Sequence, residues 1–322
     1  MSLDQEFNSY TAINDEMLDS PARVENLDIK PLRISIVQDY WHGSKELQIQ
    51  ALTQAVEIAM EFNPDLIAFN ELTLYPYACT EMNSGESKFH PEPLIGGPSY
   101  EFAAAMAKLS RANILISLYE EAEESGELGF NTVLIVSPNG EILSRTRKTH
   151  IPMGEGYFEK SYFSPGEDGT PTATIGEVLI GAPTCWDQWF PELARIYALN
   201  NADLLIYPTA IGSEPDHQDF DTQPLWQAVM VGNAIANGLF IAAVNRVGIE
   251  NCNIFYGKSF IVDPYGRIIL QADRTERAVL TADLDIQQRS DWLDLFTFFK
   301  DRRPQMYGEL IEEFELDSDE TE

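Results

Sequence analysis

Cysteine and histidine are scarce in this sequence, and their spacing excludes the common metal-binding and disulfide frameworks. The three cysteines, Cys79, Cys185 and Cys252, form an odd set without CxxC spacing, which argues for a reducing compartment and against a zinc site. The four histidines are scattered and form no HExxH pattern. A P-loop, a GxGxxG motif and a GxSxG motif are also missing. We therefore expect a site that needs no metal and no cofactor.

Basic residues are scarce too, because 21 Lys and Arg stand against 52 Asp and Glu, for a formal charge of −31. A field of this sign repels nucleic acid and anionic membranes and attracts cations, so we expect neither as a partner. A saline habitat or selection for solubility explains such acidity at least as well as substrate steering. No apolar run approaches the ~18 residues of a membrane span. The N-terminus does not resemble a signal peptide, which favours a cytoplasmic protein.

Much of the acidity lies at the two ends of the chain. Residues 1–30 hold seven acidic and two basic side chains, and residues 309–322 hold eight acidic and no basic ones. Neither stretch shows sustained apolar periodicity, which is typical of solvated tails. We therefore predict an acidic N-terminal extension over 1–30, a single domain over 31–308, and an acidic C-terminal tail over 309–322.

The body of the chain repeats one pattern. Residues 63–70 (NPDLIAFN) are echoed by residues 201–208 (NADLLIYP), and residues 130–143 are echoed by residues 256–269. Both members of the second pair contain a Pro-x-Gly triplet between two apolar runs, which predicts a β-hairpin. An amphipathic helix and a strand lie between the echoes in each half. Each half is therefore predicted to be strand–helix–strand–helix–strand–hairpin.

The composition of these strands indicates how the halves pack. Strands rich in Ile, Leu and Val are typical of a sheet that helices cover on one face. The other face is also too apolar for water, so two such sheets should pack face to face. We predict an α/β fold, a four-layer helix–sheet–sheet–helix sandwich with an internal pseudo-two-fold axis. One pocket between the sheets could then receive Glu71, Lys148 and Cys185.

Cys185 is the candidate nucleophile. It lies in the run 181–192 (GAPTCWDQWFPE), where an apolar strand gives way to a helix predicted to begin at Pro191. A thiol at such a turn faces the positive end of the helix, which favours the thiolate, and the same N–H groups can hold an oxyanion. Most free cysteines are small buried hydrophobic residues instead, so position alone leaves both interpretations open.

Two further segments supply the groups that a nucleophilic cysteine needs. Glu71 ends the apolar strand 64–71 and can take the thiol proton and later deliver it to a leaving nitrogen. Lys148 follows another strand, in the run 145–152 (RTRKTHIP), and can bind a developing oxyanion. Each is a weak signal alone, because glutamates and lysines at strand ends are usually solvated.

The order Glu, Lys, Cys and the motifs around these residues resemble the nitrilase or carbon–nitrogen hydrolase superfamily, in particular its N-carbamoylputrescine amidohydrolase branch. The matching stretches span roughly residues 32–308 and include RKTHIP at 147–152, CWDQWFPE at 185–192, YPTAIGSEP at 207–215 and DRRP at 301–304. A nine-residue run is far more specific than a short glycine motif. The resemblance implies the same sandwich fold and cleavage of a non-peptide C–N bond.

The resemblance also implies roles for individual residues. Cys185 would attack the carbonyl carbon, and Glu71 would be the general base and then the general acid. Lys148 would stabilise the oxyanion together with the backbone N–H of Trp186. Glu159, eleven residues after the lysine, corresponds to the family's second glutamate and would orient Lys148 or the attacking water.

The same resemblance gives expectations about the substrate. Asp187 and Trp189 follow the cysteine where relatives that act on N-carbamoyl amino acids carry arginines, which disfavours a substrate carboxylate. We expect both side chains to contact the substrate. Glu214 matches the residue that receives the distal ammonium of carbamoylputrescine, a solvated loop carboxylate being the alternative. Tyr77 aligns with a pocket residue, and Trp186, Trp189 and Trp226 are each either part of a pocket wall or part of the core. We expect a small cationic N-carbamoyl amine as the substrate.

The sequence departs from the N-carbamoylputrescine amidohydrolase pattern at residues 221–226, at 230–233 and directly after Glu71. These departures leave open the length of the substrate and whether it is a ureide or an amide. The leading hypothesis is conversion of N-carbamoylputrescine to putrescine, CO2 and ammonia in polyamine biosynthesis. The alternatives are an amidase or omega-amidase and, more remotely, a non-catalytic scaffold. The resemblance also implies a homodimer or higher homo-oligomer, with the apolar segment 292–299 at an interface.

Overall fold

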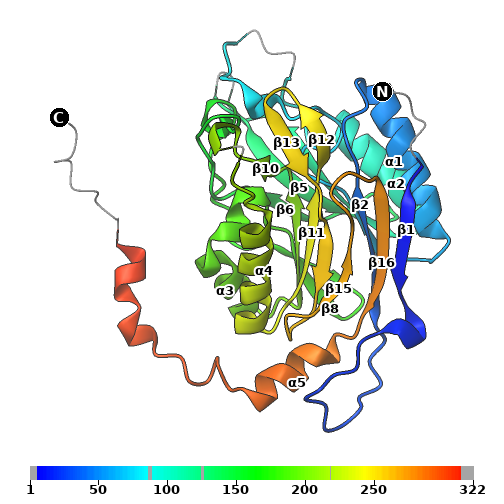
Figure 1. The fold of residues 1–322 in the computed structure, drawn as a ribbon, viewed down its shortest axis with the longest axis vertical. Coiled ribbons are helices and arrows are strands. Elements are labelled where there is room, and N and C mark those ends of the chain that lie inside the picture. The colour runs from blue at the N-terminus through cyan, green and yellow to red at the C-terminus, as the bar shows by residue number, and fades with distance from the viewer. Residues whose placement is uncertain (1–5, 86–88, 125–126, 218, 313–322) are drawn as a thin grey trace.

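A computed structural model of the chain describes residues 6–85, 89–124, 127–217 and 219–312, and Figure 1 shows its fold. The first sheet runs from edge to edge through β1 (Asn8–Ala12), β16 (Ala278–Leu284), β2 (Leu32–Gln38), β3 (Leu66–Ala68), β4 (Asn113–Glu120), β5 (Phe130–Val136) and β6 (Ile142–Arg147). The second runs through β15 (Ile268–Gln271), β14 (Phe260–Val262), β11 (Phe240–Asn245), β9 (Leu204–Thr209), β8 (Val178–Gly181) and β7 (Thr172–Ile175). A small third sheet joins β10 (Gly212–Ser213), β13 (Asn253–Tyr256) and β12 (Val247–Glu250).

The two large sheets repeat one topology. Strands β2, β3 and β4 are parallel and are followed by the antiparallel hairpin of β5 and β6. Strands β8, β9 and β11 are likewise parallel and are followed by the antiparallel strands β14 and β15. The predicted internal duplication is therefore confirmed, together with both Pro-x-Gly hairpins.

The helices form the outer layers of the sandwich. Helices α1 (Lys45–Met60) and α2 (Pro98–Ser110) cover the first sheet, and α3 (Pro191–Leu199) and α4 (Gln223–Asn237) cover the second. The Ser44 side chain accepts a hydrogen bond from the Leu47 amide and so caps the start of α1. Gly238, with a φ of +60°, ends α4 in the left-handed conformation that glycine adopts without strain.

A continuous apolar layer fills the space between the two sheets. Its members come from both sheets and are fully buried, among them Ile36, Ile135, Leu204, Ile206 and Val244. Each such side chain contributes roughly 1.5–3 kcal/mol when it leaves water. The predicted four-layer sandwich is therefore confirmed, with one core between the sheets and one under each helical layer.

The structure differs from the sequence-based expectation within residues 1–30. Residues 8–12 form strand β1, which pairs in parallel with β16 from Asn8 opposite Ala278 to Ala12 opposite Ala282. The hydroxyl of Tyr10 also donates to the Glu276 carboxylate at 2.9 Å. Local composition could not reveal this strand, because its pairing depends on the free edge of β16, some 270 residues further along the chain.

The C-terminal part of the chain leaves the body of the sandwich. Helix α5 (Gln287–Leu295) still contacts it, since the Trp292 indole donates to the carbonyl of Ile235 at 2.9 Å. Residues 296–312, here called the C-terminal arm, then extend away from the two sheets (Figure 1). Among the helices described, none has both the length and the apolar character needed to cross a membrane.

Candidate active site

The structure brings together side chains from the ends of strands in both halves. Glu71 follows β3 and Lys148 follows β6, both in the first sheet, whereas Cys185 begins a 3-10 turn (Cys185–Trp189) after β8 of the second sheet. Glu71 and Lys148 are fully buried, and Cys185 is 5% exposed. Packing of the two sheets therefore creates the site, as the predicted symmetry implied.

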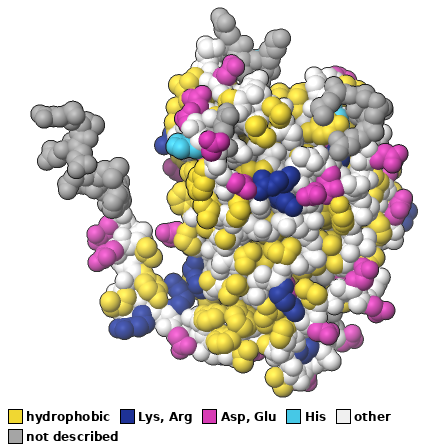
Figure 2. All heavy atoms as spheres, viewed as in Figure 1, with side chains coloured by type: hydrophobic (Ala, Val, Ile, Leu, Met, Phe, Trp, Pro, Cys, Tyr) yellow, Lys and Arg dark blue, Asp and Glu magenta, His cyan; other side chains and the backbone are white. Residues whose placement is uncertain are grey.

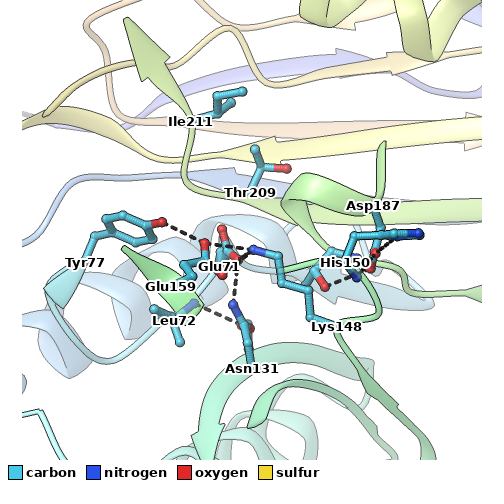
Figure 3. A network of polar contacts seen from close by, with 12 residues as sticks. Glu71, Leu72, Tyr77, Asn131, Lys148, His150, Glu159, Asp187, Thr209 and Ile211 are labelled. Atoms are coloured by element: carbon cyan, nitrogen blue, oxygen red, sulfur yellow. Dashed lines mark hydrogen bonds and ion pairs between the residues drawn. The ribbon is translucent and has the colours of Figure 1, made fainter. Parts of the chain in front are cut away.

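Lys148 lies at the centre of this group (Figure 3). Its Nζ lies 2.9 Å from Oε1 of Glu71 and 2.8 and 2.7 Å from the two oxygens of Glu159. Burial disfavours the ammonium, but the Glu159 and Glu71 carboxylates outweigh this effect and hold the pKa of Lys148 well above its usual range. Lys148 is therefore a permanently charged group at neutral pH.

Two neutral side chains fix the orientation of the glutamates. The Asn131 Nδ2 donates to Oε1 of Glu71 at 2.7 Å, and the Tyr77 hydroxyl donates to Oε1 of Glu159 at 2.7 Å (Figure 3). The second oxygen of Glu71, Oε2, is buried and accepts no hydrogen bond from the described part of the chain. Burial raises the pKa of Glu159, although Lys148 opposes the shift. Glu71 thus keeps one oxygen available for a proton.

The nucleophile candidate rests as a thiol. Burial and the nearby Glu71 carboxylate raise the pKa of Cys185 well above its usual range, while Lys148 and a hydrogen bond from the Ala210 amide oppose the shift. The expectation that backbone N–H groups at this turn favour the thiolate is therefore wrong, because burial and Glu71 outweigh them. Helix α3 does begin at Pro191, as predicted, but the 3-10 turn separates it from Cys185. Activation of this thiol requires a base.

A cavity of about 210 Å³ opens beside Cys185. Its lining combines the candidate nucleophile and Glu159 with apolar groups and one further carboxylate, and consists of Pro152, Met153, Gly154, Tyr157, Glu159, Cys185, Trp186, Ile211 and Glu214. Trp186 and Glu214, both expected from the sequence, thus border the cavity. Tyr77, the third residue expected there, does not line the cavity, but its hydroxyl donates to Glu159, which does.

Asp187 and Trp189, although within the described ranges, do not line the cavity. Trp189 packs against the core under α3 and α4. The Asp187 carboxylate accepts hydrogen bonds from the Thr184 amide at 3.1 Å and the His150 amide at 2.9 Å, and it pairs with the His150 imidazole at 2.8 Å. We therefore correct its expected substrate contact. Asp187 joins the turn of Cys185 to the loop of Lys148.

Three residues of the site were missed by sequence reasoning. Asn131 lies within an ordinary-looking strand. Tyr157 lines the cavity, and its hydroxyl oxygen accepts a hydrogen bond from the Gly212 amide at 3.0 Å. Arg246 is 1% exposed and contacts the carbonyl of Glu71. A polar side chain at the end of an apolar strand, as at Asn131 and Arg246, is the only local signal they carry.

Comparisons with known proteins agree with this geometry. A family model described as carbon–nitrogen hydrolase matches residues 33–293. The chain is 34% identical over 287 residues to a citrullinase from Francisella tularensis subsp. tularensis, covering 88% of this chain and 99% of that protein. It is 38% identical over 265 residues to an N-carbamoylputrescine amidase from Solanum tuberosum, covering 80% of this chain and 87% of that protein.

A solved structure agrees as well. The carbon–nitrogen hydrolase from Helicobacter pylori G27 superposes with a TM-score of 0.80 at 32% identity, over 88% of this chain and 99% of that chain. Both matches extend over most of the chain, and the family model includes the segments that carry Glu71, Lys148, Glu159 and Cys185. The chain therefore belongs to the carbon–nitrogen hydrolase family.

Proposed function

We propose that this protein is a thiol-dependent amidohydrolase that cleaves N-carbamoylputrescine to putrescine, CO2 and ammonia. The observation that carries the proposal is the buried cluster of Glu71, Lys148 and Glu159. It lies beside Cys185, which lines a cavity together with Glu159 and Glu214. The same proposal assigns the enzyme to polyamine biosynthesis in the cytoplasm.

The first half-reaction forms a covalent intermediate. The Sγ of Cys185 attacks the carbonyl carbon of the ureide, and Glu71 takes the thiol proton on its unpaired Oε2. Lys148, which stays charged, and the backbone N–H of Trp186 stabilise the negative charge on the carbonyl oxygen. Glu71 then gives the proton to the departing nitrogen, and ammonia or the amine leaves.

The second half-reaction releases the enzyme. A water molecule gives a proton to Glu71 and adds to the carbon bound to Cys185, after which the sulfur leaves and regains the proton. If ammonia left first, the product is a carbamate of the amine, which decomposes to amine and CO2. Glu159 holds Lys148 in place through both steps, since both its oxygens contact Nζ.

The lining of the cavity favours a cationic substrate over one with a carboxylate. Among the described residues that line it, none is Lys, Arg or His, whereas Glu214 contributes a half-buried carboxylate. A carboxylate needs a cationic partner when it leaves water. Citrulline, the substrate named for the Francisella relative, carries an ammonium and a carboxylate at its distal end. Its carboxylate finds no cation in this lining.

A substrate panel tests the proposal. Ammonia release is measured with N-carbamoylputrescine, citrulline, a neutral N-carbamoyl alkylamine, an aliphatic amide and a nitrile. We expect the highest kcat/KM with N-carbamoylputrescine. Preference for the plain amide would replace the proposal by the amidase alternative, and absence of turnover with every compound would favour a non-catalytic scaffold.

Glu214→Gln is expected to lower kcat/KM for N-carbamoylputrescine by about 30- to 1,000-fold, because removal of one partner of a desolvated ion pair costs roughly 2–4 kcal/mol. The same variant should leave kcat/KM for a neutral N-carbamoyl alkylamine of equal length nearly unchanged. Steady-state kinetics with both compounds check this. Equal losses on both would mean that Glu214 shapes the cavity and does not bind the ammonium.

The pH dependence gives an independent control on Glu214. Burial and the neighbouring Asp216 raise the pKa of Glu214, with His217 acting in the opposite direction. A carboxyl group with a raised pKa becomes neutral at a higher pH than an ordinary glutamate. As the pH falls into the mildly acidic range, KM for the cationic substrate should therefore rise before KM for the neutral one, and this difference should vanish in Glu214→Gln.

We further propose that the protein forms a homodimer or a higher homo-oligomer. Several apolar side chains of α5 and the C-terminal arm are exposed, namely Leu295, Phe296, Met306, Leu310 and Ile311. Figure 2 shows apolar surface on the arm and on the adjoining end of the molecule. Apolar surface gathered in this way is typical of an interface. Multi-angle light scattering at micromolar concentration should give at least twice the chain mass of 36.3 kDa. A monomer mass would refute the proposal.

A further inference from the structure

The backbone that carries Glu71 adopts an unfavourable conformation. Leu72, the next residue, has a φ of +50°, in the left-handed region that leucine rarely adopts. Its amide donates to the Ser117 hydroxyl at 3.0 Å, which holds one side of the turn. A strained residue beside a functional carboxylate persists only when neighbouring groups hold it, so the remaining contacts of this turn are informative.

Arg246 holds the other side of the turn from the second half of the molecule. Its Nη2 donates to the carbonyl oxygens of Glu71 at 2.9 Å, Leu72 at 3.1 Å and Tyr75 at 3.0 Å. Arg246 lies directly between β11 and β12, so the contact crosses from one half to the other. Three carbonyls on one nitrogen fix the path of the backbone that carries Glu71.

The partner of Arg246 reaches the second glutamate. Arg246 Nη1 pairs with Oε1 of Glu250 at 2.6 Å, and Oε2 of Glu250 accepts from the Tyr77 amide at 2.7 Å. The Tyr77 hydroxyl donates to Glu159 at 2.7 Å (Figure 3). One ion pair is thus connected to Glu71 through its backbone and to Glu159 through Tyr77.

We infer that the buried Arg246–Glu250 pair is a positioning device for both glutamates, and that it sets the rate of the reaction through Glu71. The inference rests on the roles proposed above for Glu71 and Glu159. A role in stability alone is a poor explanation, because a buried ion pair rarely stabilises a fold more than apolar side chains of equal size do. Moreover, Arg246 Nε is buried and has no hydrogen-bond partner within the described residues. A buried donor without a partner lowers the stability of the fold, which also argues against a purely stabilising role.

Arg246→Lys is the first test. Lysine keeps the positive charge beside Glu250, but one ammonium cannot reach three carbonyls and a carboxylate together. We expect kcat to fall by about 10- to 100-fold while KM changes by less than about 3-fold, because ground-state contacts of the substrate are untouched. Steady-state kinetics and thermal unfolding are measured on the same preparation.

Arg289→Lys is the matched control. Arg289 is also buried, donates to two carbonyls, those of Ala202 at 2.9 Å and Ala198 at 3.0 Å, and pairs with Asp203 at 3.3 Å. It contacts Ala202 and Asp203 just before β9 begins, whereas Ile211, which lines the cavity, follows the end of β9. The control should lower the melting temperature to a similar extent and leave kcat unchanged.

A double-mutant cycle distinguishes positioning of Glu71 by Arg246 from a general change in the structure around Cys185. The measured quantity is the rate at which iodoacetamide alkylates Cys185, followed by mass spectrometry, which needs no substrate. Glu71→Gln and Arg246→Lys should each change the alkylation rate by about 10-fold and in the same direction, and the double variant should react at the rate of Glu71→Gln, since Arg246 acts through Glu71. If Arg246→Lys changed the alkylation rate by the same factor in the wild type and in Glu71→Gln, the inference would be overturned.

Glu250→Gln keeps the test decisive if Arg246→Lys fails to fold. Glutamine still accepts from the Tyr77 amide but lacks the charge that orients Arg246, so kcat should again fall with KM unchanged. A kcat near that of the wild type in this variant would overturn the inference. If the wild type turns over no carbamoyl compound, the proposed function fails, whereas the alkylation cycle still decides the role of Arg246.

Discussion

Cys185→Ala is expected to abolish turnover, lowering kcat/KM by about 10^4-fold or more, because the covalent route is lost as a whole. Melting temperature should change little, since only one sulfur atom is removed from a turn that Asp187 holds in place. Cys185→Ser should be nearly as inactive, because a hydroxyl gives up its proton far less readily than a thiol. Steady-state kinetics and thermal unfolding of the three proteins check this.

The other two cysteines provide the controls. Cys252 is exposed at the turn between β12 and β13, and Cys79 is fully buried behind Glu159. Cys252→Ala should retain the wild-type rate. Mass spectrometry of the wild type with a slow substrate should locate an acyl adduct on Cys185. Appreciable turnover by Cys185→Ala, or an adduct on Cys79, would disprove the assigned nucleophile.

Lys148→Met is expected to have the second largest effect and to act on both activity and stability. It leaves Glu71 and Glu159 buried side by side without the cation that now lies within 2.9 Å of each. Removing one partner of a buried ion pair costs about 3–5 kcal/mol of folding free energy. Activity should fall by at least about 10^3-fold, because the charge that stabilises the oxyanion is lost.

The loss of stability in Lys148→Met should depend on pH. Burial already raises the pKa of Glu159, and removal of Lys148 raises it further. A carboxyl group whose pKa is higher in the folded than in the unfolded state stabilises the fold as it takes up a proton. The deficit in melting temperature should therefore be smaller at about pH 5 than at about pH 8.

An exposed lysine makes the matched comparison. Lys30 pairs with Asp65 at 3.4 Å, but its side chain is 84% exposed. Surface pairs of this kind contribute about 0–1 kcal/mol. Lys30→Met should therefore leave melting temperature and activity nearly unchanged at both pH values. A similar loss of melting temperature in both variants would show that burial of Lys148 does not cause the loss of stability.

The sequence predicted those features that depend on local pattern. The alternation of apolar strands and amphipathic helices, and the two Pro-x-Gly hairpins, required only neighbouring residues to be read. The meeting of Glu71, Lys148 and Cys185 followed from the strand ends and the internal repeat. Their convergence, with Glu159, is found in the structure.

Features that depend on distant hydrogen bonds could not be predicted. Strand β1 needs the edge of β16, and the contacts of Arg246 need three carbonyls that lie more than 170 residues away in the chain. Asp187 was expected to face a substrate, but its oxygens accept from the Thr184 amide in its own turn and from the His150 amide in another loop. Charge and position next to a nucleophile do not reveal which way a side chain points.

Strand β1 also makes the N-terminal residues important for solubility. The β16 strand that it pairs with is buried along its whole length, from Ala278 to Leu284. Removal of residues 8–12 would expose the backbone N–H and C=O groups of this apolar strand as an open sheet edge. Such an edge can pair with a strand from another molecule and so promote aggregation.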